Sequence, residues 1–98
     1  MAGRPGAKLG DAESGHSCFP PTKLIVGSNN VMTNKRPAAR VGDAFIPHCC
    51  PNAGCHSPMV AKGSSKVIIN GRPAARLGDR DSCGGVIMTG SSNVLIGG

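Results

Sequence analysis

The stretch Arg36-Pro37-Ala38-Ala39-Arg40-Val41-Gly42-Asp43 is repeated along the chain and indicates its architecture. A close copy reads Arg72-Pro73-Ala74-Ala75-Arg76-Leu77-Gly78-Asp79, and a looser one reads Arg4-Pro5-Gly6-Ala7-Lys8-Leu9-Gly10-Asp11. A regular spacing of this size indicates one supersecondary unit used repeatedly, because a single unit cannot bury its own apolar face. We therefore expect three repeats, at about 4–35, 36–71 and 72–98, to share one core.

Short β-branched runs at 23–26, 31–34, 67–70, 86–89 and 94–96 are bounded by Gly, Ser or Asn and predict strands. The segments 27–30, 63–66 and 90–93 carry the small residues that tight connections need, so we expect them to be hairpin turns. No stretch keeps a helical apolar period. The fold class predicted is all-β, with each repeat a β-hairpin, pseudo-threefold symmetry and little or no helix.

Composition limits the size of the core. The 98 residues fit a single domain over 1–98, and they include 2 aromatic residues, no Trp and no Tyr. A domain this small buries only about 60–70% of the surface that its unfolded chain exposes. We therefore expect a cross-link or a bound metal to supplement the core.

Each copy of the repeated phrase ends in an aspartate. Asp11, Asp43 and Asp79 each follow a glycine, where a carboxylate can accept backbone N–H groups in a turn. Their regular placement favours a structural role over catalysis. The basic residues that we expect to pair with them at the corners between repeats are Arg36, Arg40, Arg72 and Arg76.

Histidine and cysteine occur in register with the repeats. His16 and His48 each follow a repeat aspartate by five residues, and Cys83 follows Asp79 by four; His56 and Cys83 each precede a Gly-Ser phrase by seven. In a pseudo-threefold fold, residues at equivalent offsets converge on the axis. We predict that His16, His56 and Cys83 meet there, with His48 as a fourth ligand. Three imidazoles and one thiolate make a closed tetrahedral site for structural zinc, with iron less favoured. Such a site predicts no enzymatic activity.

The segment 48–56 leaves two alternatives open. Cys49, Cys50 and Cys55 lie close to His48 and His56, so this segment could bind metal locally with Cys18 replacing one of the four ligands. The same four cysteines could instead form disulfides. An odd count of 5 leaves at least one thiol unpaired in either case.

The proline-alanine-alanine-arginine signature at Pro37–Arg40 and Pro73–Arg76 resembles that of the PAAR-repeat family, and the resemblance covers essentially the whole chain. The first copy departs from the pattern, reading Pro5-Gly6-Ala7-Lys8. The resemblance implies a small cone that caps and sharpens the trimeric β-helical spike of a contractile injection machine. That spike is a VgrG-type protein in type VI secretion systems or the central spike of a phage tail.

The resemblance also implies a zinc near the apex, held by residues whose offsets match His16, His48, His56 and Cys83. One copy would sit on each spike trimer, presenting Ile25, Ile69 and Ile96 to the spike, and would touch the target membrane transiently during piercing. We expect no effector extension within this chain, with any effectors carried as non-covalent partners. The N-terminal residues carry no signal-peptide pattern, so we expect synthesis in the cytoplasm and delivery in a virion tail tip or through the secretion machine.

The alternative function is a small basic nucleic-acid-binding module. A formal net charge of +6 and a pI of about 9.5 favour polyanions. The chain has few aromatic residues for base stacking, and its basic residues recur at the repeat corners instead of clustering. We therefore expect no specific nucleic-acid partner.

Overall fold

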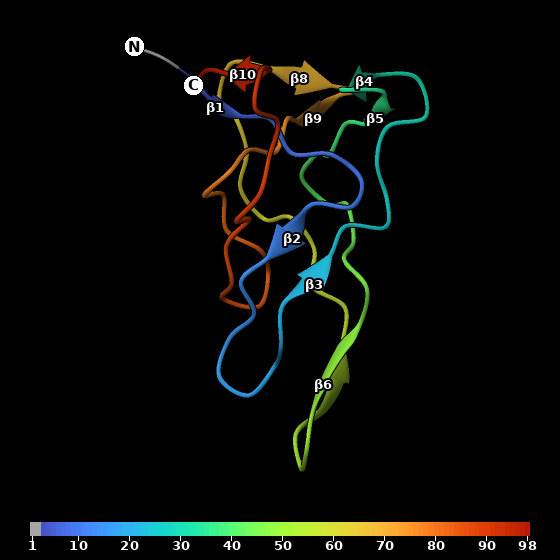
Figure 1. Cartoon of the computed structure of the whole chain (residues 1–98), viewed down its shortest axis with the longest axis vertical. Helices are drawn as coiled ribbons and strands as arrows, with labels where there is room; N and C mark the ends of the chain where they lie inside the picture. Colours follow the sequence, from blue (N-terminus) through green and yellow to red (C-terminus); the bar gives the residue numbers. More distant parts are fainter. Residues whose placement is uncertain (1–2) are drawn as a thin grey trace.

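Short antiparallel hairpins build a cone that is broad at one end and tapers to a narrow hairpin at the other (Figure 1). The computed structural model describes residues 3–98, and its principal extents are 41 × 28 × 22 Å. Within these residues there is no helix, and hence none that could cross a bilayer. The strands are β1 (Arg4–Pro5), β2 (Ala12–Glu13), β3 (Thr22–Lys23), β4 (Met32–Thr33), β5 (Arg36–Pro37), β6 (His48–Cys50), β7 (Gly54–His56), β8 (Ile68–Ile69), β9 (Arg72–Pro73) and β10 (Leu95–Ile96).

Three equivalent strand pairs form the broad end, which we call the base. Two are hairpins, β4–β5 and β8–β9, and in the third the first strand pairs with the last, β1 with β10 (Figure 1). The β4–β5 turn has φ of 51° at Asn34 and 67° at Lys35, and the β8–β9 turn has 53° at Asn70 and 79° at Gly71. Two successive positive φ values suit a tight hairpin, because they match the right-handed twist of the strands. The turns therefore lie just before the second and third Arg-Pro phrases.

The Gly-Ser segments are not the hairpin turns that we expected. Instead, Ser28 folds its own segment: its Oγ accepts the amides of Asn30 and Val31 at 3.2 and 2.9 Å. Ser64 and Ser91 make the same pair of bonds in their repeats. The preceding glycine is required by close packing, since a Cβ on Gly27 would lie 2.8 Å from the Cβ of Pro37. The small residues thus serve a close approach between repeats and a serine-capped turn.

A closed ring of hydrogen bonds joins the three repeats. The amide of Ala7 donates to the carbonyl of Ala75 at 3.0 Å, Ala75 donates to Ala39 at 2.9 Å, and Ala39 donates back to Ala7 at 3.0 Å. All three alanines are at most 1% exposed. A larger side chain at any of them would meet its two counterparts, which explains why the repeated phrase holds alanine here. The ring defines the pseudo-threefold axis and confirms the predicted all-β architecture.

The core is stacked on this ring. The equivalent residues Leu24, Val60 and Ile87 pack with Phe45 and the three alanines. Phe45 and the three aliphatic residues are each at most 2% exposed. A second, smaller cluster lies against the base strands and contains Ala38, Ala74, Ile69 and Ile96. Because Phe45 is the one aromatic residue in these two clusters and the others are small or aliphatic, the core needs few aromatic side chains.

Buried ion pairs lie at the corners, as predicted. The Arg40 guanidinium binds the Asp43 carboxylate through two nitrogens at 2.9 Å each, and Arg76 binds Asp79 in the same way at 3.1 and 3.0 Å. Arg72 reaches across to Asp43 at 3.3 Å. In the first repeat Lys8 replaces the arginine and lies 3.2 Å from Asp11. Among the pairs found in residues 3–98 there is none for Arg36.

The base strands alternate between the core and the outside. Thr33, Ile69 and Ile96 are 4%, 8% and 7% exposed, so the expectation that Ile69 and Ile96 face a partner is wrong. The residues that precede them in the same strands point outwards, since successive strand residues lie on opposite faces. These are Met32, Ile68 and Leu95, with exposures of 54%, 56% and 57%. Ile25 is exposed on a flank between the base and the tip.

Candidate metal centre

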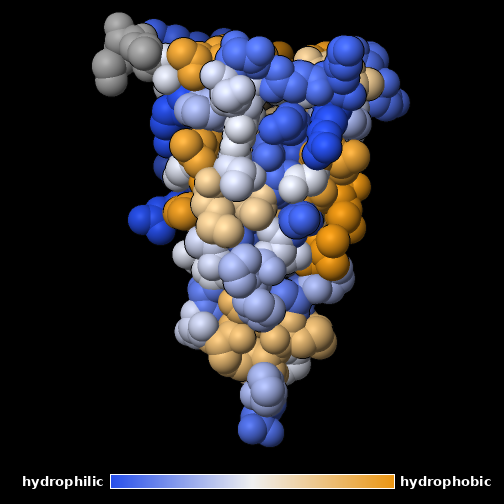
Figure 2. Space-filling view, viewed as in Figure 1, coloured by the Kyte–Doolittle hydropathy of each residue, from blue (hydrophilic) through white to orange (hydrophobic). Residues whose placement is uncertain are grey.

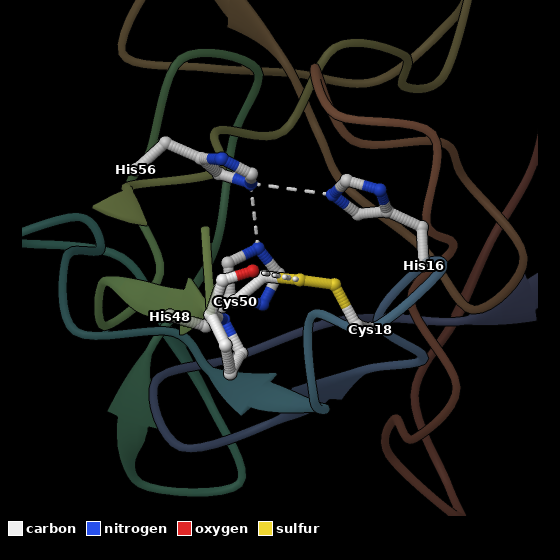
Figure 3. Close-up of a disulfide and its surroundings, with 6 residues drawn as sticks. His16, Cys18, His48, Cys50 and His56 are labelled. Carbon is white, nitrogen blue, oxygen red and sulfur yellow. Dashed lines mark hydrogen bonds between the residues drawn. A yellow bond between two sulfur atoms is a disulfide. The ribbon is translucent and has the colours of Figure 1, made fainter. Parts of the chain in front are cut away.

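Two structural elements near the narrow end bring the histidines together. His16 starts a tight turn in which its amide and carbonyl both hydrogen-bond Phe19, at 3.1 and 2.8 Å. His48 and His56 lie opposite each other in the register of β6 and β7, on the hairpin that forms the tip. Antiparallel partners in direct register project to the same face of the ribbon, so both imidazoles point towards the His16 turn (Figure 3).

The three imidazoles meet through the same ring nitrogen. The Nε2 of His56 lies 2.7 Å from the Nε2 of His48 and 3.2 Å from the Nε2 of His16 (Figure 3). Nitrogen atoms of the three rings all lie within 4.8 Å of one another. His48 is buried, whereas His16 and His56 are partly exposed, so the group has both an inner and an outer side. The structure thus brings together three of the four ligands predicted from the sequence.

Hydrogen bonding and stacking hold the rings in place. The Nδ1 of His48 lies 2.7 Å from the carbonyl oxygen of Pro20. Since a carbonyl only accepts, Nδ1 carries the proton and Nε2 is left with a lone pair that faces the other histidines. The ring of Phe19 contacts all three imidazoles, with centroid distances of 4.8 Å to His16, 5.0 Å to His48 and 4.3 Å to His56. Phe19 was not singled out in the sequence, where only its position three residues after His16 could have indicated it.

Electrostatics favour the neutral form of the His56 imidazole. Burial lowers the pKa of His56, and the nearby His48 and His16 lower it further, while the Asp81 carboxylate opposes them. A neutral ring is the form that binds a metal ion. His56 therefore favours the form that can act as a ligand.

Cys83 is the free thiol among the described residues, and it lies on the loop at 81–85. Its Sγ is 3.6 Å from the Ser82 Oγ, and it is not among the atoms that gather with the three imidazoles. The loop is nonetheless close to them, because the charge of Asp81 raises the pKa of His56 and the charge of His16 lowers the pKa of Asp81. Asp81 also shapes the loop: its Oδ1 accepts the amides of Cys83 at 2.8 Å and Gly85 at 3.0 Å.

The other four cysteines form two disulfides. Cys18 pairs with Cys50 and fastens the His16 turn to β6, as seen beside the histidines in Figure 3. Cys49 pairs with Cys55 across β6 and β7, where the two residues are in register. In this oxidised form the four sulfurs are not available as thiolate ligands, and the cysteine outside the disulfides is the one predicted from the repeat offsets.

Two acidic side chains that the sequence reasoning missed lie behind the histidines. Glu13 is 0% exposed and Asp81 5%, and as carboxylates neither the Oε2 of Glu13 nor the Oδ2 of Asp81 has a hydrogen-bond partner. Burial, a hydrogen bond with Asp81 and its charge raise the pKa of Glu13 to about 7. Burial alone would raise the pKa of Asp81, but the bond from Glu13 and the two loop amides lower it. Below about pH 7 Glu13 is therefore the protonated partner of the pair and can donate to the Asp81 carboxylate.

A regular offset could have revealed this pair. Glu13, Phe45 and Asp81 each lie two residues after a repeat aspartate, so they are equivalent under the pseudo-threefold symmetry. All three are buried, and the Oε1 of Glu13 lies 3.8 Å from the Nδ1 of His48. The axis therefore carries a carboxyl pair beside Phe45, near the imidazole cluster.

The nitrogen positions fit a tetrahedral ion with little adjustment. Zinc–imidazole distances of about 2.0–2.1 Å place two ligand nitrogens about 3.3 Å apart. The His16–His56 separation is already 3.2 Å, and the His48–His56 separation would have to widen from 2.7 Å. The three histidines form a candidate metal site whose donors are nitrogen, with a thiol on the adjacent loop.

Comparison with known proteins gives one family. A family model described as PAAR motif matches residues 14–89, which is most of the chain and includes both intact copies of the repeated phrase. No curated protein matches the sequence.

Proposed function

The chain belongs to the PAAR motif family, a family of spike-tip modules, and from this premise we propose that it caps and sharpens the trimeric spike of a contractile injection machine. The machine is a type VI secretion system with a VgrG-type spike or a contractile phage tail. One copy would sit on each trimer, with 1–98 acting as a single tip unit.

The exposed apolar side chains of the base support this proposal. Met32, Ile68 and Leu95 occupy equivalent positions of the three base pairs, and more than half of each side chain is exposed. Three apolar side chains related by a pseudo-threefold axis match the end of a partner with true threefold symmetry. The opposite end narrows to the β6–β7 hairpin, as the space-filling view shows (Figure 2). The shape thus supplies one docking face and one point.

We further propose that His16, His48, His56 and Cys83 bind zinc at this narrow end. The three imidazoles already converge, and Cys83 lies on the loop that Asp81 holds next to them. A bound ion would supply a cross-link between the His16 turn, the tip hairpin and the 81–85 loop. Structural zinc contributes about 10–16 kcal/mol of apparent binding energy in finger peptides, comparable to the stability of a whole small domain. The ion would stiffen the tip for piercing a target membrane.

A closed site and buried ion pairs argue for a structural role and not for catalysis. Four protein ligands leave zinc no open position for a water molecule. Arg40 and Arg76 are buried against Asp43 and Asp79, so part of the positive charge is neutralised inside the fold and does not face a nucleic acid. We propose that the protein is made in the cytoplasm and leaves the cell with the spike, carrying effectors as non-covalent partners.

Co-purification with a trimeric spike tests the proposal. The purified protein, mixed with a VgrG-type or phage-tail spike, should elute with it at one copy per trimer by size-exclusion chromatography with light scattering. Mass spectrometry of the native protein should show one zinc per chain. Absence of a complex with every spike tested, together with a metal-free protein, would contradict the proposal.

A further inference from the structure

One flank of the cone carries an apolar groove that the proposed function does not use. The groove has a volume of about 580 Å³, and its outer wall includes Ile25 and Ile46, which are 50% and 45% exposed. It extends from the β4–β5 hairpin at the base towards the middle of the molecule. Figure 2 shows an apolar flank below the base hairpins, with hydrophilic surface above it.

The pairing of the segments around Leu24 and Phe45 turns the side chains of Ile25 and Ile46 outwards. Leu24 and Phe45 form an antiparallel bridge, and both are buried in the core. Their neighbours therefore point to solvent, since alternate residues lie on opposite faces. The amide of Ile46 donates to the carbonyl of Lys23 at 2.8 Å, so these two side chains are neighbours on the outer face.

The two other flanks have the same backbone hydrogen bonds but different side chains. The bond from Ile46 to Lys23 recurs from Ser82 to Met59 and from Ser14 to Val86. The hydrogen bond that the Ile25 amide donates has equivalents donated by the amides of Ala61 and Met88. At the base, Lys35 is replaced by Gly71 and Gly98 in the other repeats. The combination of two isoleucines with two lysines therefore occurs on one flank, where the fold itself does not require it.

Positive charge lines the groove. Its rim holds Lys23, Lys35 and Arg36, and no acidic residue lines it. All three basic residues are exposed, and none takes part in the ion pairs found in residues 3–98. Their charge is therefore not neutralised within the described chain and is available to a partner.

We propose that this groove binds an extended segment of a partner protein in which acidic and apolar side chains alternate. Apolar side chains would pack on Ile25 and Ile46, and carboxylates would pair with Lys23, Lys35 and Arg36. A second copy of the chain is disfavoured as the occupant, because the formal net charge of +6 makes copies repel each other. The proposal rests on the proposed function only in that a spike on the base leaves this flank open.

A synthetic peptide provides the test. A fluorescein-labelled decapeptide of alternating glutamate and valine should bind the native protein at micromolar concentrations, measured by fluorescence anisotropy at moderate salt. A peptide alternating glutamate with glycine should bind at least tenfold more weakly, and one alternating lysine with valine should not bind. NMR chemical-shift changes should be confined to the amides of the groove residues.

Matched variants separate this flank from the others. Ile25→Ser and Lys35→Glu should each weaken binding about tenfold or more, whereas Met88→Ser and Lys62→Glu, exposed residues of the other flanks, should leave it unchanged. Equal losses in both sets, or equal affinity for the glutamate-glycine peptide, would overturn the proposal in favour of nonspecific charge attraction. Dimers that disappear in Ile25→Ser would overturn it in favour of self-association. Because the isolated protein is used, failure to bind a spike would leave this result unaffected.

Discussion

The Nε2 atoms of His48 and His56 lie 2.7 Å apart, although the two residues come from opposite strands of the tip hairpin. Two neutral imidazoles approach this closely when the N–H of one donates a hydrogen bond to the lone pair of the other, so a metal ion held by both would move them further apart. The Phe19 ring and the backbone carbonyl of Pro20, both outside the tip hairpin, contact these imidazoles and help to position them.

Replacement of one imidazole should release the metal. His56→Ala is expected to remove stoichiometric zinc and to lower the Tm markedly, because the ion supplies a large share of the stability of so small a domain. Zinc content by mass spectrometry and thermal unfolding would measure both effects. Cys83→Ser, which keeps all three imidazoles, should weaken zinc binding without abolishing it. Full zinc occupancy in His56→Ala would rule out this set of ligands.

The two disulfides should contribute unequally to stability. Cys18 and Cys50 are separated by 32 residues and Cys49 and Cys55 by 6. By loop-closure entropy the first cross-link is worth about 3.5 kcal/mol and the second about 2 kcal/mol. Denaturant unfolding of the double variants Cys18→Ser/Cys50→Ser and Cys49→Ser/Cys55→Ser should show the larger loss in the first. Equal losses would mean that the cross-links act on the native state and not on the unfolded chain.

The buried carboxyl pair should make the stability of the metal-free protein depend on pH. Glu13 has a folded pKa of about 7 against an ordinary value of 4.5, so the folded protein binds a proton that the unfolded chain has released. Its contribution is fully present below about pH 4.5 and is lost as the pH rises through 7.

Glu13→Gln supplies the control, because its amide stays neutral and can still donate to Asp81. All other ionisable side chains are common to the two proteins, so the difference between the two Tm profiles isolates Glu13. We expect the wild type to lose several degrees relative to the variant between pH 4.5 and 8, measured in the presence of a chelator. Parallel profiles would show that the pair does not hold a shared proton.

Charge introduced at the base should block docking on the spike. Ile68→Asp and Leu95→Asp place a carboxylate on an exposed apolar site, so each should lower spike affinity by tenfold or more with little change in Tm. Met88→Asp, on a flank and 46% exposed, is the matched control. Surface plasmon resonance against the spike trimer would measure the affinities, and an equal loss in Met88→Asp would point to a general effect of charge.

The alanine ring should not tolerate larger residues. Ala39 is 0% exposed and hydrogen-bonds its counterparts in both other repeats, so Ala39→Leu would force them apart. Overpacking of this kind costs about 1–3 kcal/mol, to which strain in the ring would add. Ala61→Leu, on an exposed flank, should be nearly neutral. Denaturant unfolding of the two variants would compare them, and similar stabilities would show that the ring can expand.

Regular spacing explains how much of this fold could be predicted from the sequence. The repeated phrase indicated three units around an axis. Offsets from its aspartate indicated His16 and His48, and the offset from the Gly-Ser phrase indicated His56, as residues that meet. The turns were placed wrongly because Gly27 and Ser28 resemble hairpin residues, while the actual turn at Asn34 and Lys35 depends on positive φ values that the composition does not reveal.

Other features depend on contacts between repeats. Which cysteines pair follows from the register of β6 with β7 and from the position of the His16 turn, neither of which the spacing of cysteines specifies. The direction of Ile69 and Ile96 follows from where the two-residue strands begin, and an error of one residue exchanges the two faces. The repeat period therefore indicates which residues are equivalent, but it does not indicate which way they point.

Approximate symmetry at the base has a consequence for imaging. A chain whose three corners present methionine, isoleucine and leucine can be seated on a threefold partner in three rotational settings. At this apolar triangle the settings differ only by a thioether or a branch point, so a population of particles would contain all three. Reconstructions with imposed symmetry would average Lys35 with Gly71 and Gly98 and erase the groove on the flank. Asymmetric classification of individual particles is needed to see which direction it faces.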